Sequence, residues 1–302
     1  MRCVLLTLFA VLQMNGQEVL FEGHVYDKKT KEPIPYVNLS FLNTLKGSST
    51  DEEGHFSIDI PKPYLENKVH ISSLGFKDTI VDAKIIYKAK KFEMVEESFE
   101  LDEVVVSENF SDSDVLNPIG SYSLTSGFSS SSTPWILALY FPNIGAQKKY
   151  VEKLTVFLNK TRGFKQTHAK FRFRIYNVDP KTKKPGKNLL QKSVVLEHDV
   201  EKEYVSLDVS AQQIGIPKEG IYIGLEWLFV PSNWYLQKEK NAITNKEVIE
   251  DRFAPTFAGV YTKNQNYKVM VYGMGEWTDF KVRSRNNTEN FIPAISLRIK
   301  KK

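Results

Sequence analysis

The sequence contains little of the chemistry on which most enzymes depend. Among its 302 residues there are five histidines and a single cysteine, Cys3. It has no GxSxG nucleophile turn and no glycine-rich phosphate loop. No apolar run reaches the roughly 18 residues of a membrane-spanning helix. Helical periodicity is almost absent as well, so these absences favour a β-rich protein without a membrane helix.

The amino terminus has the pattern of an export signal. Arg2 is followed by an apolar run from Val4 to Leu12 and then by Asn15 and Gly16, which predicts a signal peptide over residues 1–16. Cys3 lies inside it, so the mature chain would have neither a disulfide nor a thiolate metal site. We expect an exported, bacterial protein, located in the periplasm, at the outer-membrane surface or in the medium.

Short alternating runs of apolar and polar residues recur along the chain. Examples are HFSIDI at 55–60, KFRFRIY at 170–176 and AISLRIK at 294–300. They predict an all-β protein with two β-sandwich domains, at residues 17–106 and 134–302, the second jelly-roll-like. The serine-rich segment 107–133 is expected to be part linker and part opening strand. The run NKEVIEDRF at 245–253 is interpreted as a short helix.

Charge divides the two expected domains. Residues 17–106 carry 11 basic and 17 acidic residues, whereas residues 133–302 carry 29 basic and 16 acidic ones. An acidic module is therefore joined to a basic one.

A long stretch of the first module follows a family pattern. The stretch is GHVYDKKTKEPIPYVNLSFLNTLKGSSTDEEGHFSIDIP at 23–61, followed by ISSLGFKDTIV at 71–81. The positions that carry the pattern are Gly23, Val25, Asp27, Thr30, Pro33, Ile34, Val37, Gly47, Thr50, Asp51, Gly54 and Phe56. This part resembles the carboxypeptidase regulatory-like domain, a small transthyretin-like sandwich common in exported proteins of Bacteroidetes. From Pro134 onward the chain is similar only to uncharacterised partners of that domain, so no activity is implied.

The run TDEEGHF at 50–56 could be read as a metal site or as a turn. The family resemblance implies a hairpin connection in which Gly54 takes a positive φ, Asp51 bonds to the turn backbone, and Phe56 and Ile58 enter the core. A calcium loop needs alternating oxygen ligands over about twelve residues, whereas strand alternation resumes here at Phe56. The sequence therefore predicts a turn and no metal site.

The family name raises the question of zinc peptidase chemistry. An HxxE spacing occurs at His198 and Glu201, but no histidine follows to supply a third ligand. We therefore predict no enzyme and no cofactor.

The segment LDEVVVSE at 101–108 resembles one that joins this domain to the plug of nutrient-uptake receptors. It could pair by strand addition with an energy-transducing protein. The remaining chain lacks room for a receptor barrel, so it is interpreted as the last strand of the first sandwich.

Three expected strands carry basic residues on one face. Strand alternation places them opposite apolar residues such as Phe171 and Leu297. They are Lys170, Arg172 and Arg174, then Lys281, Arg283 and Arg285, and finally Arg298 with Lys300. If the strands are neighbours, they form a cationic surface for an acidic polysaccharide, lipopolysaccharide or an acidic protein face, including the first module itself. The alternative is that these residues only solvate the strands.

Aromatic residues provide a second candidate binding signal. Trp234 and Tyr235 lie in a predicted loop, directly after Pro231-Ser232-Asn233. Trp277 follows Gly273 and Gly275, which are interpreted as turn residues. Such rings could stack on sugars or simply pack in loops, and Trp227 is assigned to the core.

These features predict a non-catalytic envelope protein that binds an acidic glycan or an envelope protein. Nucleic acid is not expected, because the sequence has no recognition helix or stacking motif. Membrane association is expected to be peripheral only. A purely structural envelope component is one alternative, and a hydrolase with an unrecognised site in the second sandwich is the other.

Overall fold

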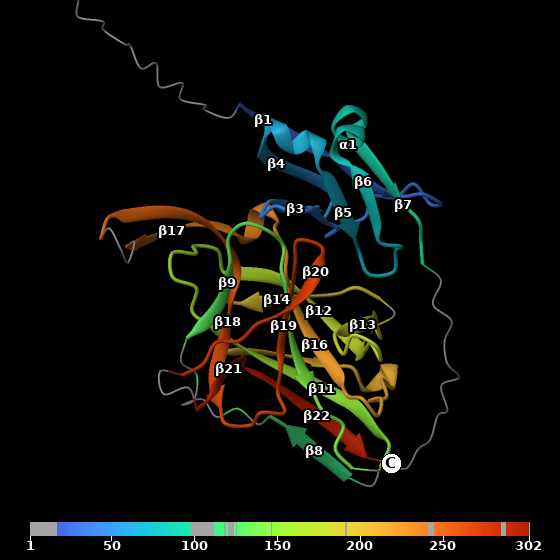
Figure 1. The fold of residues 1–302 in the computed structure, drawn as a ribbon, viewed down its shortest axis with the longest axis vertical. Helices are drawn as coiled ribbons and strands as arrows, with labels where there is room; N and C mark the ends of the chain where they lie inside the picture. Colours follow the sequence, from blue (N-terminus) through green and yellow to red (C-terminus); the bar gives the residue numbers. More distant parts are fainter. Residues whose placement is uncertain are drawn as a thin grey trace, which may run out of the picture.

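The computed structural model describes residues 17–97, 112–117, 119, 124, 126–145, 147–190, 192–240, 245–284 and 288–301. The expected signal peptide and the LDEVVVSE segment lie outside these residues. Within them the chain is mostly β-strand and forms two β-sandwich domains, as predicted, with the first above the second in Figure 1. No helix in the described part is long and apolar enough to cross a membrane.

The first domain packs two small sheets and one short helix around an apolar core. One sheet has the order β4-β1-β7 and the other β3-β2-β5-β6. Alternate residues of their strands, such as Phe21, Leu39 and Phe56, meet in the core. The elements are β1 (Glu18–Asp27), β2 (Asn38–Phe41), β3 (Gly47–Ser49), β4 (His55–Pro61), η1 (Lys62–Glu66), β5 (Lys68–Ser72), β6 (Thr79–Asp82), α1 (Ala83–Ala89) and β7 (Lys91–Met94).

The TDEEGHF run forms the predicted turn. Oδ1 of Asp51 accepts hydrogen bonds from the backbone N–H groups of Glu53 at 3.1 Å and His55 at 2.8 Å. Gly54 has φ +74°, a conformation that residues with a Cβ rarely adopt. Phe56 is buried and Ile58 packs against the core. The carboxylate of Asp51 is thus used to hold the turn.

The second domain consists of two larger sheets packed face to face. One has the order β13-β12-β16-β10-β19-β20, with β14 also paired to β12. The other has the order β17-β18-β11-β22-β8, with β15 on β11 and β21 and β9 on β18. Phe171, Phe173 and Ile175 of β12 enter the core between the sheets, as the alternation predicts.

The strands of the second domain begin earlier than the expected boundary at residue 134. Two of them come from the serine-rich segment, β8 (Asp112–Leu116) and β9 (Gly127–Ser130). The next are β10 (Ile136–Phe141), β11 (Lys149–Asn159), β12 (His168–Val178), β13 (Pro185–Asn188), β14 (Val194–Asp199) and β15 (Tyr204–Asp208). After η3 (Ser210–Gln212) come β16 (Ile221–Trp227), η4 (Pro231–Asn233), β17 (Trp234–Lys240), β18 (Glu247–Thr262), β19 (Val269–Gly273), β20 (Glu276–Asp279), β21 (Asn290–Pro293) and β22 (Ile295–Lys301).

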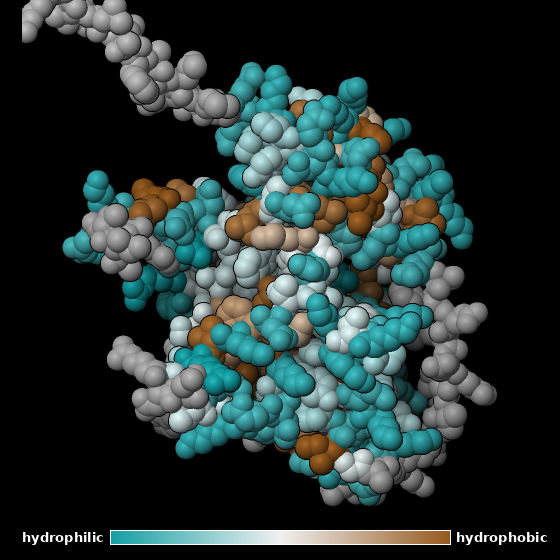
Figure 2. Space-filling model, in the orientation of Figure 1, coloured by the Kyte–Doolittle hydropathy of each residue, from teal (hydrophilic) through white to brown (hydrophobic). Residues whose placement is uncertain are grey.

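The helix expected over residues 245–253 is wrong. Residues 247–253 begin the long strand β18, which pairs antiparallel with β17 from Trp234–Phe253 to Lys240–Glu247. This hairpin extends from the body of the domain as an arm (Figure 1), and hydrophobic side chains gather on it in Figure 2. Trp234, Leu236 and Ile249 of the arm are each about half exposed.

Candidate functional site

The basic face of β12 points away from its own core, as predicted, but it is not a free surface. Arg172 is fully buried and Arg174 is 7% exposed. The outer face of the first domain's β3-β2-β5-β6 sheet covers them, and Leu74 of that domain joins the apolar cluster of the second. Among the ligands considered for this ladder, the acidic first module is the one that contacts it.

A buried carboxylate of β16 neutralises the two arginines. Oε1 of Glu226 lies 3.1 Å from an Nη of Arg172, and an Nη of Arg174 donates to the same oxygen at 3.2 Å. From the first domain, the side-chain amide of Asn38 donates to Glu226, and the backbone carbonyl of Tyr36 accepts from Arg172. Burial alone would raise the pKa of Glu226, but the charges of Arg174 and Arg172 outweigh it and lower that pKa. The ion cluster therefore belongs to the domain interface.

Acid should destabilise the protein through Glu226. Its folded-state pKa is lowered, so its contribution to stability is fully present above its unfolded-state pKa of about 4.3 and is lost as the pH falls through the folded-state value. Urea unfolding of the native protein and of a Glu226→Gln variant between about pH 6 and pH 3 measures this. We expect the native protein to lose more stability than the variant; parallel curves would contradict the assignment.

The interface has further polar contacts beside the ion cluster. Lys170 forms an ion pair with Glu52 of the first domain and donates to the Tyr36 hydroxyl at 3.3 Å. The backbone N–H of Ser49 donates to the carbonyl of Phe229 at 3.3 Å, and the Ser49 hydroxyl accepts from the Phe229 N–H at 3.0 Å. Contacts thus run from the start of β12 to the residues that follow β16.

The described residues of the three expected basic strands do not form one cationic surface. Lys281 and Arg283 lie in the connection between β20 and β21, where the expected strand is replaced by one isolated bridge between Arg283 and Asn290. Arg298 is exposed on β22, which belongs to the sheet opposite β12. Arg285 lies outside the described residues. The alternation of residues predicted the directions in which the side chains of β12 and β22 point, but it did not predict which strands are neighbours.

A groove in the second domain does bring basic and aromatic residues together. Its volume is about 690 Å³, and strands β16, β19, β20 and β21 line it with the loop before β13. Its basic residues are Lys183, Lys184, Lys268, Lys281 and Arg283, against the acidic Glu276 and Asp279. Its rings include Tyr222, Tyr267, Trp277 and Phe280. Three of the expected binding residues, Lys281, Arg283 and Trp277, therefore meet at this site.

Trp277 is held at the groove by a tight hairpin. Strands β19 and β20 are joined by Met274 (φ +54°) and Gly275 (φ +93°), the pattern of a two-residue turn with both φ values positive. The indole packs at 5.5 Å on the ring of Tyr176 and at 5.3 Å on that of Tyr272. Nζ of Lys184 donates to the Trp277 carbonyl at 2.7 Å. Gly275 is thus a turn residue, as expected.

The first domain can now be assigned to a family. Residues 21–106 match the family model of the CarboxypepD_reg-like domain. This part of the chain is a CarboxypepD_reg-like domain. A domain of this kind indicates a binding or scaffolding role, without specifying a partner.

The other comparisons add no function. No curated protein matches the chain. The clostridial cysteine protease Cwp84 after propeptide cleavage is 11% identical over 93% of this chain and 70% of that one, with a TM-score of 0.39. The cysteine protease and lectin-like domains of Cwp84, a surface layer associated protein of Clostridium difficile, give 11% identity over 89% of this chain and 59% of that one, with a TM-score of 0.37. Likeness at these TM-scores supports no inference about this chain.

The aromatic pair expected to bind sugar does not join Trp277. Trp234 begins β17 rather than lying in a loop, is 46% exposed, and donates from Nε1 to Asp251 at 2.8 Å. Tyr235 points the other way and is buried beside Ala169 and Ala254. Trp227 is buried, as expected. Neither Trp234 nor Tyr235 lines the groove that contains Trp277.

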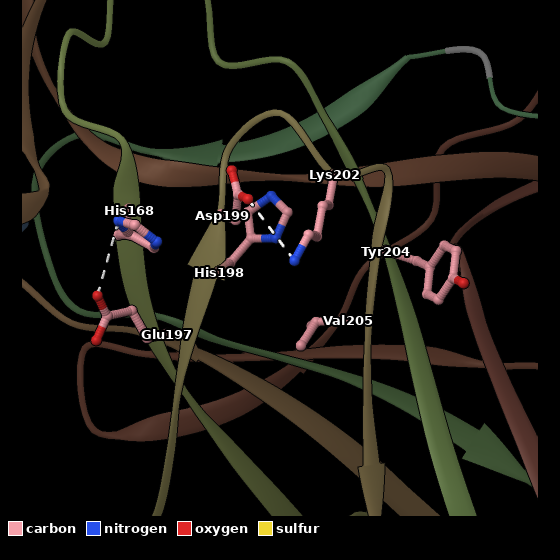
Figure 3. Close-up of a pocket in the computed structure, with 7 residues that line it drawn as sticks. All are labelled: His168, Glu197, His198, Asp199, Lys202, Tyr204 and Val205. Carbon is pink, nitrogen blue, oxygen red and sulfur yellow. Dashed lines mark ion pairs between the residues drawn. The ribbon is translucent and has the colours of Figure 1, made fainter.

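The two residues of the HxxE pair have different surroundings. His198 lines a small pocket of about 310 Å³ with His168, Glu197, Asp199 and Lys202 (Figure 3). Burial lowers the pKa of His198 to about 4, so its imidazole is neutral. Glu201 instead pairs with Lys160 at 3.3 Å. Within the described ranges no group of three or more His, Cys, Asp or Glu side chains is placed to hold a metal ion.

Several residues of the interface and groove were not predicted from the sequence. Glu226 was the most predictable of them, because it is the one acidic residue in the apolar strand GLEWLFV. A charge in such a strand requires a buried partner, and the arginines of KFRFRIY supply it. Lys184 and Lys268 come from loops that no sequence pattern connects to Trp277.

Proposed function

We propose that this protein is a non-catalytic binding protein of the bacterial cell envelope whose second domain binds an acidic glycan in the groove at Trp277. The observation that carries the proposal is the combination of one partly exposed indole with five basic and two acidic residues around a single groove. An excess of cations attracts a polyanion, and an aromatic ring offers a flat apolar face to a sugar. The export signal expected at residues 1–16 fits such a ligand.

The β12 ladder has no part in this site. Lys170, Arg172 and Arg174 are engaged by the CarboxypepD_reg-like domain and by Glu226. The CarboxypepD_reg-like domain therefore acts as a support that covers this face, whereas the basic residues of the groove lie outside that interface.

The test is binding of the intact mature chain to a uronic-acid polysaccharide and to neutral dextran at low and moderate salt. We expect salt-sensitive binding to the acidic polymer alone. Trp277→Ala should weaken it about tenfold, since a lost aromatic contact is worth roughly 1–1.5 kcal/mol. A double variant, Lys268→Met with Lys281→Met, should weaken it about five- to tenfold, because it removes two groove charges.

Arg298→Met is the matched control, since Arg298 is exposed on the opposite sheet. If Arg298→Met weakened binding as strongly as the groove variants do, the proposed site would be contradicted. Absence of binding to either polymer would leave a structural role for the protein.

A further inference from the structure

The β19–β20 hairpin, which carries Trp277, contacts the CarboxypepD_reg-like domain at two points. The first is a hydrogen bond of 3.2 Å between the Tyr272 hydroxyl and Nδ1 of His70. The second is at the turn, where a Cβ placed on Gly275 would approach Leu42 to 2.8 Å. The hairpin therefore borders the groove on one side and the other domain on the other, and in Figure 1 β20 reaches up to the first domain.

We propose that the CarboxypepD_reg-like domain positions Trp277 for ligand binding through His70 and Tyr272. For its effect on affinity, this inference rests on the proposed glycan function. His70 and Tyr272 are positioning residues, because neither lines the groove. The domain thereby acts on a site that it does not itself contain.

The side chains form a continuous series from one domain to the groove. Oδ2 of Asp78 lies 3.4 Å from Nε2 of His70, and the His70 side chain is only 10% exposed, which restricts its orientation. Tyr272 then packs its ring 5.3 Å from that of Trp277 at an interplanar angle of 60°. Burial raises the pKa of Tyr272 to about 12, so its hydroxyl keeps the proton for this hydrogen bond.

Within the second domain, Trp277 pairs with Tyr272 across the hairpin and packs against the apolar cluster that contains Tyr176 and Tyr222. The hydrogen bond from Lys184 holds its backbone carbonyl, and Tyr176 contacts one part of the indole at an interplanar angle of 81°. Tyr272 supplies a second ring contact. Without its link to His70, Tyr272 is held by packing alone, and the indole resting on it gains freedom. Ordering that ring again on binding costs affinity.

The experiment compares His70→Ala, Tyr272→Phe and His70→Asn in the full mature chain, each checked for folding by thermal unfolding. Tyr272→Phe keeps the ring and removes only the hydroxyl, whereas His70→Asn retains an acceptor near the position of Nδ1. Glu52→Gln is the matched control, since it breaks a contact at the Lys170 side of the same interface. Incorporated 5-fluorotryptophan reports on the indole by NMR without any ligand, and Trp277→Phe assigns its signal.

We expect His70→Ala and Tyr272→Phe to shift the Trp277 resonance and to weaken binding of the uronic-acid polysaccharide about three- to tenfold, the worth of one hydrogen bond. His70→Asn should restore most of the native resonance position and most of the native affinity. Glu52→Gln should change neither the resonance nor the affinity. An unmoved resonance in both variants, or an equal shift in Glu52→Gln, would overturn the inference. A shifted resonance in a protein that binds no glycan would support the positioning and refute the proposed function instead.

Discussion

Replacing Glu226 by alanine is expected to lower the free energy of unfolding by about 3–5 kcal/mol, because it leaves two buried guanidinium groups without their counter-charge. Arg172 has no exposed side-chain surface and Arg174 has 9%. Both guanidinium groups are therefore largely shielded from water, and arginine does not lose its proton in proteins. Urea unfolding followed by far-UV circular dichroism gives the value.

The surface variant Glu219→Ala serves as the control, since this residue is exposed, and should change stability by less than about 0.5 kcal/mol. A loss in Glu226→Ala of similar size to that in Glu219→Ala would show that the ion cluster does not stabilise the fold. Replacing Arg172, Arg174 and Glu226 together by apolar residues should recover much of the loss, because removing every charge leaves none unpaired.

Removing the CarboxypepD_reg-like domain is expected to change both the stability and the binding of the second domain. A chain of residues 107–302 exposes the β12 face, where Lys170 loses Glu52 and Arg172 loses the carbonyl of Tyr36. It also loses Leu74 from its apolar cluster. We expect a melting temperature at least about 5 °C lower than that of the intact chain. We also expect new binding to acidic polymers at low salt that Trp277→Ala does not abolish.

Calorimetry of the shortened and intact chains tests the first expectation, and binding with and without Trp277→Ala tests the second. Equal melting temperatures would mean that docking contributes little stability. If Trp277→Ala removed all binding by the shortened chain, the uncovered arginines would have no affinity of their own.

Local patterns predicted the strands well, since the two faces of a strand follow directly from alternation. Phe171 and Phe173 enter the core and Arg172 leaves it, as expected. Alternation cannot show what covers the outer face, however, because that depends on a domain distant in the sequence. The prediction of a helix at residues 245–253 was wrong for a related reason. The charged and branched residues of this segment suit a helix or a strand, and pairing with β17 makes it a strand.

The groove itself was not predicted, although three of the residues that line it were named from the sequence. Trp277 and its glycine turn were identified from the sequence. Lys281 and Arg283 were also named as binding residues, but on the basis of a strand that the structure does not contain. Lys184, far earlier in the chain, reaches the groove only through the topology of the sheet. The sequence thus shows which residues are charged, whereas only the fold shows which charged residues lie close together.

The place of β22 in its sheet sets the order in which the chain can fold during synthesis. This strand, Ile295–Lys301, lies between β11 and β8, so β8 must wait for nearly the whole second domain to be made. The first domain is complete at β7 and can fold much earlier, as amino-terminal domains generally do. Until the second domain has folded, the β3-β2-β5-β6 sheet exposes Asn38, Ser40, Ser49 and His70 to water. A docking surface with this many polar side chains is less prone to aggregate during that interval than an apolar one.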